Sequence, residues 1–145
     1  MTKLLLLTAV LFVGCAKAND VGRLEDEVVT TAARYQPSVH ELENRANELR
    51  KLGKLAPEAD SHLREALATI SHMKGTLAGT TRGELERTTK DDPELVQKKL
   101  DNLERALEEG ILDATDHLQT VENWITANEH NPSLAGTPPP PFKAY

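Results

Sequence analysis

The longest uninterrupted pattern in the sequence lies between Asp92 and His130, where apolar residues recur every three or four positions. This spacing places them on one side of an α-helix. Asp92 is a suitable N-cap, Pro93 fits the first helical position, and Pro132 cannot continue a helix. The pattern therefore predicts one helix of about 55 Å. Its apolar stripe consists of Val96, Leu100, Leu103, Leu107, Ile111, Ala114, Leu118, Val121 and Ile125.

An earlier amphipathic segment has apolar positions on both sides of Pro37, a residue that kinks or breaks the interior of a helix. Because Ser38 and Glu41 form a capping-box pattern directly after it, we expect a sharp kink or a restart there. Gly53 can take the left-handed conformation of a C-cap and marks the end of this arm. The stripe comprises Val21, Leu24, Val28, Ala32, Tyr35, Val39, Leu42, Ala46, Leu49 and Leu52.

A second segment lies between these two arms, beginning near Pro57 and broken near Gly79. A further capping-box pattern, Thr81 followed by Glu84, predicts a short extra helix that ends at Thr89. The stripe of the longer part consists of Leu55, Ala59, Leu63, Leu67, Ile70, Met73 and Leu77.

The three arms have similar lengths and short connections, which favours neighbouring antiparallel helices. We therefore expect an all-α fold: an antiparallel, up-down-up three-helix bundle or a long helical hairpin. Its first arm would be kinked near Pro37 and its second arm broken near Gly79, within one domain over residues 19–130. Residues 131–145 contain four consecutive prolines and are predicted to form a disordered, proline-rich tail.

Residues 1–18 have the features of a signal peptide. Lys3 supplies the positive charge, residues 4–14 form an apolar segment too short to span a bilayer, and small residues precede a cleavage position after Ala18. The sequence thus predicts a secreted or periplasmic protein without a transmembrane span.

An alternative interpretation concerns Cys15, because residues 11–15 resemble the lipobox of bacterial lipoproteins. The signal would then comprise residues 1–14, and a lipidated Cys15 would tether the protein to a membrane. Cys15 is the only cysteine, so the mature chain has no disulfide in either case.

The charge balance excludes one class of partner. Removal of residues 1–18 takes away two of the 17 basic residues, and the remaining 15 face 23 acidic residues, a formal charge of −8. This balance opposes binding to nucleic acid, and no cluster of lysine and arginine offsets it. We expect no nucleic-acid partner.

The sequence predicts no enzyme, no catalytic residue and no cofactor. The mature chain has no cysteine, its serines lie in no recognisable nucleophile motif, and its glycines are too sparse for a phosphate-binding loop.

Two histidines follow a carboxylate by one helical turn, Glu58 with His62 and Asp113 with His117. Facing each other on two helices, these pairs would supply four metal ligands. The same spacing joins acidic residues to arginine or lysine elsewhere in the chain, where no metal is implied. Exposed ion pairs are the favoured interpretation, and no metal site is predicted.

These features predict a non-catalytic protein that acts by protein–protein binding or scaffolding. An incompletely covered stripe on the long helix is the candidate surface for a protein partner or for self-association. Two alternatives stay open: a carrier of an apolar ligand or lipid in a cavity lined by leucine and alanine, and a structural coiled-coil assembly protein. The residues of the candidate surface are Ile111, Leu118, Val121, Trp124 and Ile125.

Overall fold

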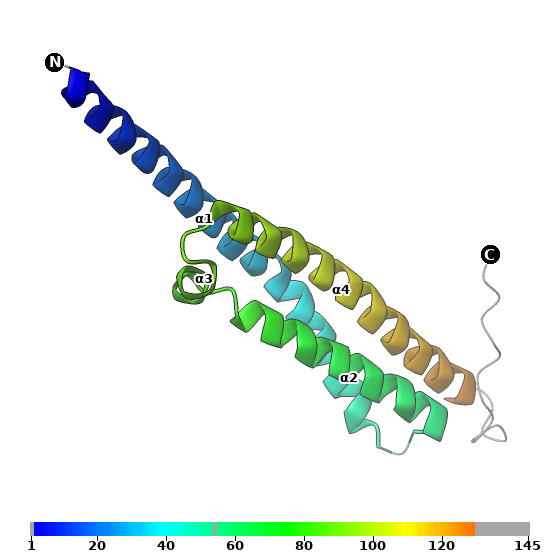
Figure 1. Ribbon diagram of the computed structural model, residues 1–145. Helices are drawn as coiled ribbons and strands as arrows, with labels where there is room; N and C mark the ends of the chain where they lie inside the picture. Colours follow the sequence, from blue (N-terminus) through cyan, green and yellow to red (C-terminus); the bar gives the residue numbers. More distant parts are fainter. Residues whose placement is uncertain (1, 54, 130–145) are drawn as a thin grey trace, which may run out of the picture. The chain divides into compact units, whose positions relative to one another are not determined.

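The computed structural model describes the backbone of residues 2–53 and 55–129 and the side chains of residues 20–53 and 55–128. Within these ranges the chain is all-helical and contains no strand, which confirms the predicted class. The expected tail over residues 131–145 lies outside the described residues. The helices are α1 (Thr2–Lys51), α2 (Pro57–Ala78), α3 (Arg82–Thr89) and α4 (Pro93–Glu129) (Figure 1).

The ends of several helices follow the sequence signals. The Asp92 side chain accepts a hydrogen bond of 3.0 Å from the backbone N–H of Glu94 and so caps α4. Gly53 has a φ of +93° just after the end of α1, as a glycine C-cap should. Thr81 precedes α3 but makes no side-chain capping bond, and the Glu84 carboxylate accepts a hydrogen bond from Arg87.

Of the two expectations at Pro37, the restart is wrong, since α1 is one helix that contains this proline, and the kink stays a prediction. A proline inside a helix removes a backbone hydrogen bond, and that loss is offset where the helix buries an apolar stripe on both sides of it. Val28 and Val39, on either side, are 1% and 2% exposed. The predicted break near Gly79 does occur, between the end of α2 and the start of α3.

The chain is organised as two compact units, and both α1 and α4 contribute to each of them. Unit 1 combines the chain up to Gln36 with Gly75–Ala106, and unit 2 combines Pro37–Lys74 with the chain from Leu107 onward. Within the part of the chain that the structure describes, no helix is long and apolar enough to cross a membrane.

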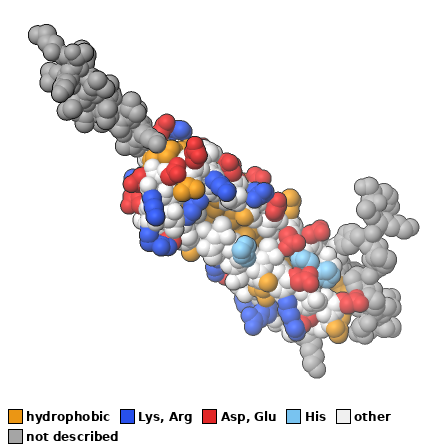
Figure 2. Space-filling model, in the orientation of Figure 1, with side chains coloured by type: hydrophobic (Ala, Val, Ile, Leu, Met, Phe, Trp, Pro, Cys, Tyr) orange, Lys and Arg blue, Asp and Glu red, His pale blue; other side chains and the backbone are white. Residues whose placement is uncertain are grey.

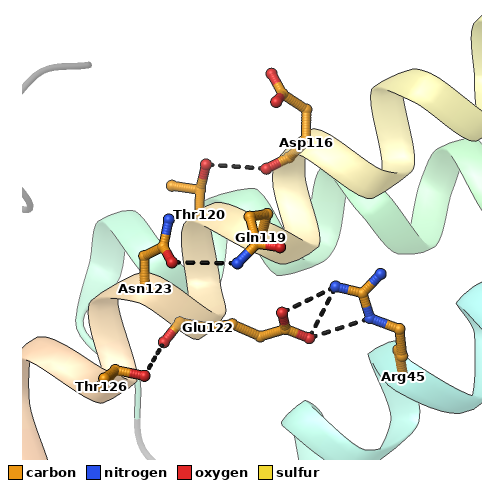
Figure 3. Close-up of polar contacts among 7 residues, drawn as sticks. All are labelled: Arg45, Asp116, Gln119, Thr120, Glu122, Asn123 and Thr126. Carbon is orange, nitrogen blue, oxygen red and sulfur yellow. Dashed lines mark hydrogen bonds and ion pairs between the residues drawn. The ribbon is translucent and has the colours of Figure 1, made fainter. Parts of the chain in front are cut away.

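Unit 2 consists of segments of α1, α2 and α4 that lie side by side (Figure 1). Arg45 on α1 donates hydrogen bonds to both carboxylate oxygens of Glu122 on α4, at N–O distances of 2.8–3.1 Å (Figure 3). Lys74 on α2 contacts Glu43 on α1 at 2.5 Å. These polar contacts flank a core of aliphatic side chains and one tryptophan: Val39, Leu42, Ala46, Leu49, Ala59, Leu63, Ala66, Ile70, Met73, Leu107, Ala114, Leu118, Val121 and Trp124.

The Met73 side chain of α2 packs directly against Gly110 of α4 in unit 2. A Cβ atom built on Gly110 would lie 2.7 Å from the Sδ atom of Met73, a distance that real Cβ atoms do not tolerate. Met73 is itself buried, with 1% exposure. Two further pairs join the helices: Thr69 contacts Asp113, and His62 contacts His117. In these pairs the residue number falls along α2 as it rises along α4. The two segments therefore run in opposite directions.

Unit 1 contains a buried carboxyl group. Glu25 is 4% exposed, and its Oε1 atom has no hydrogen-bond partner among the described residues. Burial raises the pKa of Glu25 above its usual range, repulsion from Glu86, Asp91 and Asp26 adds to the rise, and Arg82 opposes it. The buried apolar residues of unit 1 are Val21, Leu24, Val28, Ala32, Leu85, Val96, Leu100 and Leu103.

We expect Gly110→Ala to lower the free energy of unfolding by about 1 kcal/mol, because overpacking against Met73 outweighs the gain in helix propensity. Denaturant titration followed by circular dichroism measures this. The matched control is Gly75→Ala on α2, where a Cβ atom would meet nothing within 4 Å. That variant should be neutral or more stable, and an equal gain for both variants would contradict the packing argument.

For Glu25, the raised pKa means that the folded chain holds this proton more tightly than the unfolded chain. Its contribution to stability is therefore fully present below the ordinary glutamate pKa and is lost as pH rises through the folded value. Glu25→Gln should raise the free energy of unfolding at pH 8 by up to about 1 kcal/mol and flatten its pH dependence. Thermal unfolding between pH 4 and 8 measures both effects. Exposed Glu27→Gln is the control, and a parallel pH profile for wild type and Glu25→Gln would refute the assignment.

Candidate metal centre

Two half-buried histidines from different helices meet in unit 2. His62 on α2 and His117 on α4 have their Nδ1 atoms 2.8 Å apart, a hydrogen-bonding distance, and their ring centroids 5.1 Å apart. A neutral imidazole has one N–H donor and one acceptor nitrogen, so one ring must donate to the other. The pair thus joins α2 to α4 directly.

Two carboxylates lie on the other side of His117. Its Nε2 atom is 3.2 Å from Oε2 of Glu65 on α2 and 3.6 Å from Oδ1 of Asp113 on α4. The carboxylate side chains are about half exposed, 57% for Glu65 and 53% for Asp113, whereas His117 is only 22% exposed. The second oxygen of Asp113 accepts a hydrogen bond of 2.7 Å from the Thr69 hydroxyl.

Local helix geometry explains how these side chains come together. Glu65 follows His62 by three residues and His117 follows Asp113 by four, so each helix presents one histidine and one carboxylate on the same face. Leu63 and Leu118, which are adjacent to the histidines in sequence, are 4% and 0% exposed. The polar groups therefore stand at the edge of a packed core, on rigid elements. On the face drawn in Figure 2, histidine side chains lie beside acidic ones.

The arrangement is suited to a metal ion. One ligand atom from each of His62, Glu65 and His117 can be chosen so that all three lie within 4.8 Å of one another. Two ligands of a single tetrahedral ion, with bonds of about 2.0–2.2 Å, are separated by about 3.3–3.5 Å. Because Nδ1 of His117 faces His62 while its Nε2 faces Glu65, a histidine ring must turn about its Cβ–Cγ bond for one ion to be bound by all three side chains. Imidazole nitrogen with carboxylate oxygen suits zinc, copper and nickel better than magnesium or calcium.

The sequence had indicated only part of this group. It paired Asp113 with His117, which do lie 3.6 Å apart, and it paired His62 with Glu58. The structure places Glu65, on the following turn, in the group instead. The spacing of His62 and Glu65 is visible in the sequence, but nothing in the sequence alone shows that α2 and α4 are aligned to bring both histidines together.

The residues predicted as an interaction surface lie mostly inside unit 2. Leu118 and Val121 are fully buried, and Trp124 is 8% exposed. Ile111 and Ile125 are half-buried. The uncovered stripe expected at Leu118 and Val121 is therefore not present, because α1 and α2 cover it. Whether any of the five residues contacts a partner stays a prediction.

Other features bear on the remaining expectations. Leu112 on α4 is 71% exposed, more than any other large apolar side chain that the structure describes. A hollow on unit 2 has a mixed lining rather than one of leucine and alanine; it is formed by Arg50, Asp60, Leu63, Arg64 and Leu67. Cys15, the candidate for lipidation, falls within α1, and its side chain is outside those described.

No protein-family model matches this chain, and no significant match was found among curated proteins or among solved structures.

Proposed function

We propose that this chain is an exported, non-catalytic helical protein that binds a divalent transition-metal ion through His62, His117 and Glu65. The observation that supports the proposal is the convergence of three donor atoms from two helices within 4.8 Å. A surface ion pair joins one acidic and one basic side chain. The contact of 2.8 Å between the ring nitrogens of His62 and His117 joins two histidines and is therefore not explained as an ion pair.

The proposal includes export, supported by the features of residues 1–18, with cleavage after Ala18 or lipidation of Cys15 as the two routes. It also includes an up-down-up course of the three arms, supported by the opposite directions of α2 and α4 in unit 2. Outside the cytoplasm the protein would meet metal ions without competition from its own thiols, because the only cysteine lies at position 15.

Protein binding or self-association is a second candidate function. It is supported by the exposed Leu112, which adjoins the half-buried Ile111 on α4.

Calorimetric titration of the untagged exported protein with Zn²⁺ and Ni²⁺ tests metal binding. We expect saturable binding of one ion per chain, weakened about tenfold or more by His62→Ala or His117→Ala, since each removes a ligand. Exposed His40→Ala and His72→Ala, also in unit 2, are the matched controls and should bind as the wild type does. Absence of saturable binding, or equal losses in all four variants, would rule the proposal out.

A further inference from the structure

The donor group in unit 2 supplies three side chains and no fourth. Ligand atoms of His62, Glu65 and His117 lie within 4.8 Å of one another, and no other histidine, cysteine, aspartate or glutamate among the described residues joins them. Zinc binds four ligands, and sites with three protein ligands keep the remaining position for water or another exchangeable molecule. An ion at this site would therefore have one position for a ligand from outside the chain.

The site is closed towards the core and open towards solvent. Leu63 and Leu118, next to the histidines in sequence, are 4% and 0% exposed. Glu65 is more than half exposed, and the two histidines are partly exposed. A ligand from solution can therefore reach the ion on the side where Glu65 lies.

Asp113 lies beside the site without belonging to the donor group. Its Oδ2 atom accepts a hydrogen bond of 2.7 Å from the Thr69 hydroxyl, while Oδ1 lies 3.6 Å from Nε2 of His117. A carboxylate that is hydrogen-bonded in this way and stands next to a metal-binding histidine acts on the ion from outside its coordination shell. Asp113 thus adds a negative charge close to the ion but no ligand.

The charges around the site distinguish among ligands for the open position. A divalent ion bound by two neutral imidazoles and the Glu65 carboxylate keeps a single positive charge. The nearby Asp113 carboxylate balances that charge, so a neutral ligand leaves the site balanced and an anion does not. Among neutral side chains, imidazole is the one that suits zinc, copper and nickel.

We propose that the bound ion keeps one open position and that this position takes a neutral nitrogen donor, the imidazole of a histidine on a second protein or peptide. Asp113 disfavours anions there. This inference rests on the proposed metal binding and adds the kind of partner. A histidine of the partner can bind the ion while His62, His117 and Glu65 still hold it.

The untagged wild-type protein loaded with Co²⁺ tests the open position, with imidazole and azide as the probes. The visible spectrum of bound Co²⁺ changes when a new ligand joins the ion. We expect a saturable change with imidazole, and dialysis should show that the cobalt stays with the chain. Asp113→Asn removes the charge at nearly constant size. It should strengthen azide binding about threefold or more while imidazole binding stays the same, because only the anion is repelled.

The matched control is Asp116→Asn, which removes an exposed carboxylate from α4 and should leave both affinities unchanged. Circular dichroism verifies that each variant is folded. A wild-type spectrum that responds to neither probe would overturn the open position and leave metal binding intact. Unchanged azide binding in Asp113→Asn, or a tenfold loss of its Co²⁺ affinity, would overturn the role given to Asp113 and with it the preference for a neutral donor. Failure of the wild-type protein to bind Co²⁺ at all would overturn the proposed function as well.

Discussion

The close contact between α2 and α4 at Gly110 is the constraint on which the rest of unit 2 depends. Only a residue without a Cβ atom lets the backbone of α4 approach the buried Met73 side chain so closely. From this point the pairs Thr69 with Asp113 and His62 with His117 follow along the two helices.

The histidine pair carries a cost that the aliphatic core alone would avoid. Polar atoms at the edge of a core are tolerated only when they are hydrogen-bonded, and a partly satisfied polar group is worse than an apolar one. Leucine at positions 62 and 117 would extend the core without this requirement. The two imidazoles hydrogen-bond to each other, and His117 also pairs with Glu65 and Asp113, so this cost is offset by partners within unit 2.

Much of the helical architecture could be predicted from the sequence, because it depends on local rules. The period of the apolar stripe, the Asp92 cap and the proline at position 93 define α4 to within a residue at each end. The restart expected after Pro37 is wrong because the local cost of a proline, about 3 kcal/mol, is offset by burial of residues such as Val28 and Val39 in one continuous helix. Local rules do not include that tertiary gain.

The candidate site could be predicted only in part, for a different reason. Spacing along one helix shows which side chains share a face, and it correctly associated Asp113 with His117. The choice of Glu65 rather than Glu58 depends on how α2 is aligned with α4, which spacing along one helix does not show. A glycine in the middle of an otherwise regular apolar pattern is a sequence signal for close helix approach, although it does not identify the partner residue.

A metal ion would also supply what this core lacks. The buried side chains of unit 2 are mainly alanine, valine and leucine with a single tryptophan, and no cysteine lies beyond position 15 to cross-link its helices. A bound ion with ligands from α2 and α4 stabilises the folded state in proportion to its free concentration relative to its dissociation constant, because the unfolded chain does not preform the site. Such a cross-link is released by removing the ion, whereas a disulfide is broken only by a reductant or by thiol exchange. The helical pairing in unit 2 would then depend on the supply of metal in the protein's surroundings.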